Sequence, residues 1–396
     1  LVLDQSPVRE VESPGWVSGD FHQHTVKSLD SNMPVRTKLI ENLVEGVEVA
    51  VVTDHNNLAD YGPYAEELGV TDLVHTMVGM EVSYTSIGHF NAFPLAVGGD
   101  YPFAMIGAQF WSKKGPQLMM DDVLELFPEA LIQVNHPRDD LDGYYSWLNM
   151  DPLTGEERAE GRVLSKTPVA VEVNEQFALP EMLGEEGEEL LLSLSPYEIP
   201  AMVDWLNLVD SGYPITGMAN SDSHNYGSGT GYPRTYLYVG DDDDLSTMTD
   251  KVVTDAIRDQ RAVMSQGILA WPEVNGEVRL GTKQAVTVSE DGTAEIVLEI
   301  RAPSWVKVGG ATVLQGKRPL EVSYLDGKLH PYDNGTMSWE SFGQVEGEPL
   351  TTSLTYVLSP EESTYYIFNV YGESNEGQLY GGYSYALTNP IYVNVP

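Results

Sequence analysis

The first two-thirds of the chain alternate between short, β-branched apolar runs and stretches with a helical spacing of apolar residues. The apolar runs end in polar side chains: residues 47–53 lead into Asp54 and His55, and residues 130–134 lead into His136. Strands that alternate with helices are typical of a parallel sheet. Polar residues gathered at the ends of such strands are typical of a barrel whose strand-to-helix loops form a site. This alternation therefore predicts an α/β barrel with its chemistry at one end.

Further segments of the same region fit this pattern. Three more apolar runs end at Glu81, at Asn174 and at residues 221–224. Helices are predicted over residues 37–45 and 200–210, because apolar side chains recur there at helical spacing and Gly46 and Gly212 follow as stop signals.

The pattern changes after about Gly267, where helical periodicity is nearly lost. Strand-like runs separated by Asp-Gly and Asn-Gly turns occupy residues 294–300, 320–324, 364–370, 383–387 and 391–395. We predict two domains, a barrel over residues 1–275 and an antiparallel, sandwich-like β module over residues 276–396. The module is expected to contribute no metal ligand; alternatively, a loop around residues 333–335 reaches over the site.

The charge and the missing cysteines restrict the chemistry. The formal net charge is −39, so the surface repels nucleic acid, and a nucleic-acid partner is not expected. The acidic runs at 241–244 and 185–189 are read as solvated surface. With no cysteine in the chain, any metal must be held by His, Asp or Glu.

The expected location is outside the cytoplasm. No run is long and apolar enough to span a bilayer. The chain begins at Leu1 without a basic and then apolar leader, which suggests a trimmed form of an exported protein. We expect an extracellular or periplasmic protein, although the lack of cysteines also fits a cytosolic one.

The histidines point most directly to function. His22 and His24 flank Gln23 at a strand end, so both side chains point the same way and can chelate one ion. Asp20 precedes this pair and Asp30 follows it. The other candidate ligands are His55, Glu81, His89, His136, Asp222 and His224. A lone buried histidine is more often structural than a ligand, and we prefer that reading for His75 and His330.

Five segments, in this order, resemble the motifs of the PHP (polymerase and histidinol phosphatase) superfamily of metallohydrolases. They are Gly19-Asp-Phe-His-Gln-His-Thr25, Thr53-Asp-His-Asn56, Gly79-Met-Glu81, Asn135-His-Pro-Arg138 and Ser221-Asp-Ser-His224. Three shorter strings are similar to an exported branch that includes carbaryl esterase-like proteins: Ser28-Leu-Asp-Ser31, Gly88-His-Phe-Asn91 and Thr388-Asn-Pro-Ile391. The superfamily resemblance spans about residues 18–240.

The resemblance implies a distorted (β/α)7 barrel and two or three divalent ions of zinc, manganese or iron. Carried over by motif, the ligands are His22, His24, Glu81 and Asp222 for one ion, Glu81, His136 and His89 for a second, and Asp30, His55 and His224 for a third. Glu81 would bridge the first two ions. Many relatives carry histidine where Asp30 stands, which puts the third site in question, although a carboxylate suits a hard cation.

Four other residues have open readings. Asp54 is a candidate catalytic residue, a carboxylate that orients a metal-bound histidine, or a strand cap. Arg138 would hold a phosphate or carboxylate, or pair with a neighbouring aspartate (Asp139 or Asp140). Arg234 would face the pocket or form a structural ion pair, and Tyr226 would line the entrance.

Three functions follow, from two classes. The first is hydrolysis of a small phosphate ester by metal-activated water. The second is hydrolysis of a carboxylic or carbamic ester at the same centre, where a metal would polarise the carbonyl. The third is an extracellular structural protein that keeps the barrel as a scaffold, and the full ligand set argues against it. The sequence leaves the oligomeric state open.

Overall fold

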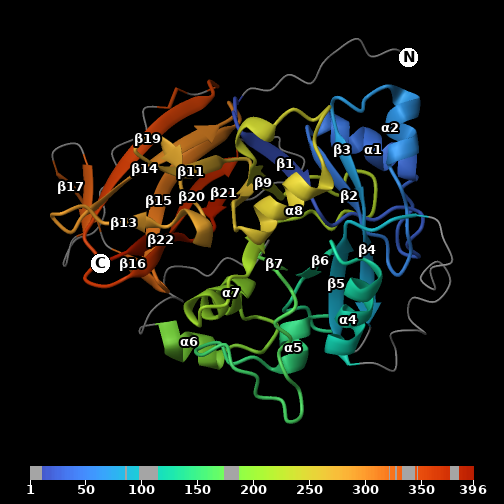
Figure 1. Cartoon of the computed structure of the whole chain (residues 1–396), viewed down its shortest axis with the longest axis horizontal. Helices are drawn as coiled ribbons and strands as arrows, with labels where there is room; N and C mark the ends of the chain where they lie inside the picture. The colour runs from blue at the N-terminus through green and yellow to red at the C-terminus, as the bar shows by residue number, and fades with distance from the viewer. Residues whose placement is uncertain are drawn as a thin grey trace.

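The computed structural model describes residues 11–84, 87–97, 115–173, 187–320, 322–325, 328–331, 344–345, 347–374 and 383–396. Within these ranges many strands and few helices form a mixed α/β protein (Figure 1). Asn174, Glu185, Glu186 and residues 333–335, all named above, lie outside them.

The longest sheet joins strands from both ends of the chain. Its hydrogen-bonded order is β13-β22-β20-β21-β10-β9-β1-β2-β3, with β15 added on β20 and β16 on β15. Its strands are β1 (Trp16–Asp20), β2 (Val49–Val52), β3 (His75–Val78), β9 (Arg234–Tyr238), β10 (Ala262–Gln266), β13 (Val286–Thr287), β15 (Val306–Gln315), β16 (Arg318–Leu320), β20 (Thr364–Ser374), β21 (Tyr383–Thr388) and β22 (Ile391–Asn394). β1, β2 and β3 are parallel, whereas β9 is antiparallel to both β1 and β10.

A second sheet packs on the other side of the N-terminal core. Its order is β4-β5-β6-β7-β8. Its strands are β4 (Met80–Tyr84), β5 (Gly88–Phe93), β6 (Leu131–Val134), β7 (Ala170–Glu172) and β8 (Thr216–Met218). The inward side chains of both sheets form one buried cluster, to which β1, β2, β6 and β8 contribute Val17, Val51, Leu131 and Met218.

The chain passes directly from one sheet to the other at Gly79, between β3 and β4. A Cβ atom placed on Gly79 would lie 3.0 Å from side-chain atoms of Val51 and Thr53 and 3.1 Å from the Val52 carbonyl oxygen. A larger residue would therefore crowd β2 at the point where the chain enters β4, two residues before Glu81.

The expectation of a parallel sheet is correct only in part. β6, β7 and β8 are parallel, but β4/β5, β5/β6 and β1/β9 are antiparallel. The short connection from Tyr84 to Gly88 explains the first exception, because a parallel crossover needs a dozen or more residues. The two sheets enclose one core, and a closed (β/α)7 barrel remains a prediction.

The helices pack outside these sheets (Figure 1). They are α1 (Val35–Val44), α2 (Gly62–Leu68), α4 (Pro116–Leu126), α5 (Tyr144–Leu148), α6 (Glu188–Ser193), α7 (Ala201–Asp210) and α8 (Asp250–Arg258). The helices predicted over residues 37–45 and 200–210 are α1 and α7. Gly46 and Gly212 follow them with φ of 68° and 81°, a left-handed backbone that glycine adopts without strain.

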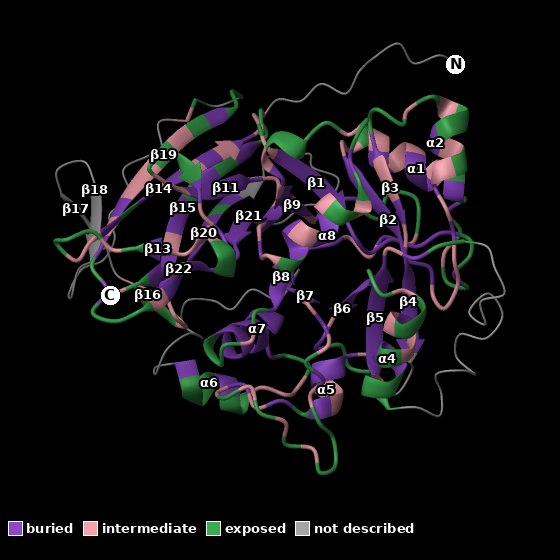
Figure 2. Ribbon diagram, viewed as in Figure 1, coloured by how far each residue is buried: buried purple, intermediate pink, exposed green. Residues whose placement is uncertain are grey.

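The C-terminal strands form two layers around a second core. One layer is the part of the longest sheet that contains β15, β20, β21 and β22, and the other is a separate sheet. The six-stranded layer has the order β12-β11-β14-β19-β18-β17. Its strands are β11 (Leu269–Val274), β12 (Glu277–Val278), β14 (Ala294–Ala302), β17 (Val322–Leu325), β18 (Lys328–Pro331) and β19 (Leu350–Leu358). The buried faces of β14, β19 and β20 contribute Ile296, Tyr356 and Phe368 to the core between the layers, drawn purple in Figure 2.

The predicted division at 275/276 does not interrupt the sheets. β10, which precedes it, pairs with β21 over Val263–Gln266, and β11 pairs with β14. Hydrogen-bonded strands therefore cross the predicted boundary. The division of the chain into two separate domains remains a prediction.

Candidate metal centre

The candidate ligands meet where β1, β2, β6 and β8 end. The backbones of the first and fifth motifs are joined there: the His24 N–H donates to the Ser223 carbonyl (3.0 Å) and the Asp222 N–H to the His22 carbonyl (2.9 Å). His55 and Glu81 form an isolated parallel bridge in the same way. Backbone pairing thus brings together side chains that are far apart in sequence.

Glu81 is the fully buried centre of this cluster. Its Oε1 lies 3.2 Å from His22 Nε2, 3.1 Å from His89 Nδ1 and 3.3 Å from His136 Nε2, and its Oε2 lies 2.5 Å from His55 Nδ1 and 3.8 Å from His24 Nε2. One carboxylate therefore faces five imidazoles.

Two further carboxylates extend the cluster outward. Asp222 Oδ1 lies 3.0 Å from His24 Nε2 and 3.2 Å from His22 Nε2. Asp30 Oδ2 lies 3.0 Å from His55 Nε2 and 3.4 Å from His224 Nε2. Asp30 thus occupies the place that the resemblance assigns to a ligand.

Four groups of donors in the described residues could each hold a cation, with all donor atoms of a group within 4.8 Å of one another. They are His24, Asp30, His55 and His224; His22, Glu81 and His136; His22, His24 and Asp222; and His55, Glu81 and His89. All nine predicted ligands occur in these groups. That they bind metal remains a prediction.

The donor atoms also fit an ion because hydrogen bonds do not satisfy them. His24 Nε2, both ring nitrogens of His89 and Asp222 Oδ1 are buried and make no well-directed hydrogen bond among the described residues, although His24 Nε2 lies 3.0 Å from Asp222 Oδ1 and His89 Nδ1 lies 3.1 Å from Glu81 Oε1. Buried polar atoms are normally paired, because desolvation without a partner is costly. Divalent cations with nitrogen and oxygen ligands would satisfy one nitrogen of each ring and the Asp222 oxygen, because His24 and Asp222 share one donor group and His89 belongs to another.

Charge inside the cluster is strongly perturbed. Burial opposes the ionisation of Glu81, but the charges of His22 and His89 outweigh it and hold the pKa of Glu81 well below its usual range. Burial also opposes the charge on His136, yet its hydrogen bond to Glu81 raises the pKa of His136 to about 9. A cation would take the place of these protons, since metal-bound imidazole must be neutral.

Two of the candidate ligands have a left-handed backbone. The φ angle is 23° for His136 and 48° for Asp222, values that residues with a side chain rarely adopt. Such strain persists only where surrounding contacts fix it, and it concentrates at functional sites.

Asp54 fixes the loop that follows the first motif. Its Oδ1 accepts the Thr25 N–H (2.6 Å), the Ser28 N–H (3.0 Å) and the Ser28 hydroxyl (2.8 Å), and its Oδ2 accepts the Thr25 hydroxyl (2.7 Å). The Ser28 hydroxyl lies 2.9 Å from His24 Nδ1. These contacts match the orienting role that we considered for Asp54 and give no support to a catalytic one.

Arg138 does not reach the cluster through its contacts. It is fully buried, and its guanidinium donates to both oxygens of Asp204 (2.6 Å each) and to the carbonyls of Met150 and Pro196. Neither a substrate role nor pairing with Asp139 or Asp140 is supported. The partner of Arg138 is instead Asp204 on α7. This pair could not be predicted, because the two residues are far apart in the sequence.

The remaining predicted residues have mixed outcomes. Arg234 donates to the carbonyls of Gly231 and Glu45, which is a structural role. Tyr226 is 62% exposed, two residues after His224. His75 Nε2 lies 2.8 Å from Asp250 Oδ1, away from the cluster, as the structural reading expects.

Sequence reasoning missed Glu172, which is 1% exposed and lies 2.8 Å from His22 Nδ1. It is the one charged residue in the apolar run 169–173, and that is the signal that could have revealed it. Asp142, whose Oδ1 lies 3.5 Å from His89 Nε2, was also missed.

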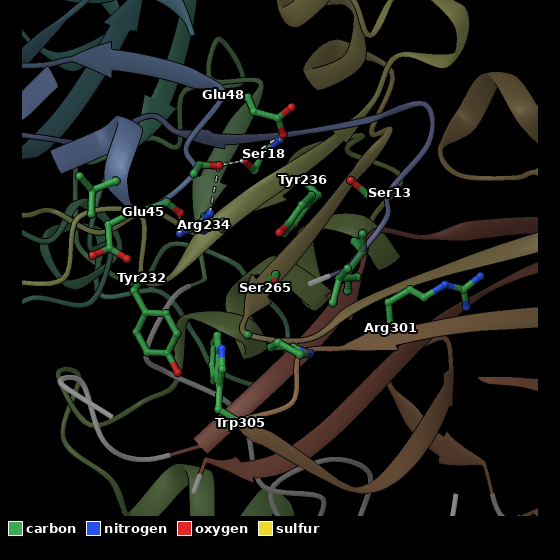
Figure 3. A pocket seen from close by; sticks show the side chains of 16 residues that line it. Ser13, Ser18, Glu45, Glu48, Tyr232, Arg234, Tyr236, Ser265, Arg301 and Trp305 are labelled. Atoms are coloured by element: carbon green, nitrogen blue, oxygen red, sulfur yellow. Dashed lines mark hydrogen bonds between the residues drawn. The ribbon is translucent and has the colours of Figure 1, made fainter. Parts of the chain in front are cut away.

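A cavity of about 290 Å³ lies elsewhere in the molecule (Figure 3). Its lining includes Glu45, Tyr232, Arg234, Arg301 and Trp305. It shares no lining residue with the cluster, so it is no part of the candidate metal centre.

Comparison with known proteins adds little. No protein-family model and no curated protein matches the chain. A solved structure from Bifidobacterium adolescentis, described as a proposed metal-dependent phosphoesterase, is 15% identical and covers 60% of this chain and 94% of its own, with a TM-score of 0.30. That likeness is too low to carry an argument. Among the described residues, no helix has the length and apolar character needed to cross a bilayer.

Proposed function

We propose that the chain is a metal-dependent hydrolase that cleaves small phosphate esters. One observation carries the proposal: nine histidine, aspartate and glutamate side chains gather in four overlapping donor groups around Glu81, and several of their buried donor atoms make no well-directed hydrogen bond among the described residues. The ordered motifs that resemble PHP metallohydrolases support the same reading.

The donor groups overlap, which favours phosphate over other esters. His22, His24, His55 and Glu81 each belong to two groups, so ions held there would be neighbours. Adjacent divalent ions lower the pKa of water and neutralise charge on phosphoryl oxygens, which suits phosphoryl transfer in particular.

Exposure indicates how a substrate would approach. The side chains of His22, His24 and Glu81 are 0% exposed, whereas those of Asp30 and Asp222 are 53% and 36% exposed. His55, His136 and His224 are intermediate. The ester would therefore arrive over Asp30 and the outer histidines, with Glu81 below them.

The test compares esters on protein loaded separately with zinc, manganese or iron. Turnover of p-nitrophenyl phosphate or bis-p-nitrophenyl phosphate, lost on chelation and restored by metal, would support the proposal. Turnover of naphthyl acetate or a naphthyl carbamate alone would instead select the carboxylic or carbamic esterase. No turnover with any of these metals and esters would favour a structural protein that keeps the scaffold.

A further inference from the structure

We propose that Glu172 is the positioning residue of the metal centre, with one carboxylate oxygen fixing the ring of His22 and the other fixing the backbone of His136. The inference rests on the proposed function only in taking these histidines as metal ligands. It assigns a role to a residue outside all four donor groups.

The first oxygen determines which nitrogen of His22 can bind an ion. Glu172 Oε1 lies 2.8 Å from His22 Nδ1. An ionised carboxylate only accepts hydrogen bonds, so Nδ1 must carry the proton and donate it. The lone pair is then on Nε2, the atom that lies 3.2 Å from both Glu81 Oε1 and Asp222 Oδ1. Glu172 therefore sets both the tautomer and the direction of this ligand.

The second oxygen holds a strained backbone. Glu172 Oε2 accepts the His136 N–H at 2.8 Å, and His136 is the residue whose φ is 23°. This conformation directs His136 Nε2 to within 3.3 Å of Glu81 Oε1. Without the acceptor, the unfavourable φ would have one contact fewer to hold it.

The other contacts of Glu172 suit this role. Its Oε1 also accepts from Gln133 Nε2 (3.2 Å) and Asn220 Nδ2 (3.0 Å), so each of these contacts is a donor that faces the buried carboxylate. Neutral donors hold the anion in place without neutralising it, and the residue is 1% exposed. A glutamine here could accept from His22 or from the His136 N–H, but its NH2 group would face the other donor.

The experiment measures metal affinity of Glu172→Gln with Zn²⁺ and Mn²⁺ in chelator competition. We expect affinity to fall by about 10- to 100-fold, the range for loss of a partner that orients a ligand. The matched control is Glu48→Gln. Glu48 is also a buried glutamate, and it accepts from the Ser18 N–H (2.9 Å) and hydroxyl (3.1 Å) near the start of β2. The control should keep the wild-type affinity.

A merely structural role would lower the melting temperature of metal-free Glu172→Gln and leave its metal affinity unchanged, and that result would overturn the proposal. If the variant does not fold, histidine ¹H–¹⁵N spectra of the metal-loaded wild-type chain decide instead. His22 must show a proton on Nδ1 and none on Nε2, and the reverse tautomer would refute the assignment. Wild-type protein that binds metal but cleaves no ester would contradict the proposed function alone.

Discussion

At the scale of single residues, the centre depends on where Glu81 lies. Its two oxygens face different sets of imidazoles, with His22, His89 and His136 near Oε1 and His55 near Oε2. A carboxylate with both oxygens engaged can join neighbouring ions, whereas a neutral imidazole offers one lone pair and binds a single ion.

Glu81→Gln should therefore impair the protein more than His55→Gln. The amide keeps the size of the side chain but loses the charge and one acceptor, so more than one donor group is damaged. We expect a fall in rate of at least about 100-fold, corresponding to about 3 kcal/mol of lost stabilisation of the transition state. Elemental analysis and initial rates test this. Full metal content with a near-normal rate would contradict the bridging role.

Asp54→Asn separates orientation from catalysis. Four donors face this carboxylate, and an amide NH2 would confront at least one of them. We expect metal content and rate to fall together, so that the rate per bound metal stays constant. A variant with full metal content and a lost rate would show that Asp54 acts on the substrate.

At the scale of elements, α7 is fastened to the loop after β6 by the pair Arg138–Asp204. Both side chains are fully buried and bonded through two nitrogens and two oxygens. Such a pair carries a large penalty when one partner is removed, because the other is left charged in a dry interior.

Arg138→Met should lower the free energy of unfolding by about 3–5 kcal/mol and leave the rate per folded molecule unchanged. Adding Asp204→Leu should recover much of that loss, because no buried charge then remains. Urea unfolding and assays at low temperature measure the two quantities. A large drop in the rate of well-folded Arg138→Met would instead support the predicted contact between Arg138 and the substrate.

The elements show how far sequence reasoning reaches. The candidate ligands His55, Glu81 and His136 could be chosen because each adjoins a predicted strand, whereas Asp30 and His89 came from the resemblance to the family motifs. Asp204 could not be assigned to Arg138, because the pair depends on how α7 packs. The antiparallel directions of β5 and β9 were missed as well, since the same residues suit either pairing direction. Glu172 was missed because polar residues were sought after the predicted strand 169–173, at Asn174, whereas Glu172 is the last residue of β7 itself.

At the scale of the whole molecule, the cluster concentrates negative charge in a chain that already carries −39. Removing metal would leave Asp30, Glu81 and Asp222 with only protonated histidines to offset their charge, because burial is outweighed by the surrounding imidazoles, which lower the pKa of all three carboxyls. Chelation should therefore abolish turnover and destabilise the fold by about 3–4 kcal/mol relative to metal in large excess. Calorimetry with and without chelator tests this, and an unchanged melting temperature after confirmed metal loss would refute it.

The C-terminal strands should add no ligand. His330 lies on β18, in the six-stranded layer, which contains none of the nine candidates. His330→Ala should keep metal stoichiometry and a rate within about twofold, well under 1 kcal/mol in barrier height. Loss of one metal equivalent would show that this layer completes the site.

The pairing of β10 with β21 also has a consequence for the timing of folding during synthesis. β1, which leads into the His22 motif, pairs with β9, β9 with β10, and β10 with a strand from residues 383–388. While the ribosome is still adding the C-terminal strands, the nascent chain therefore has an open edge at β10. Unpaired edges invite contact with other chains. This edge of the N-terminal half therefore stays unpaired until residues 383–388 have been made, and a chaperone that shields β10 would shorten the interval in which it can aggregate.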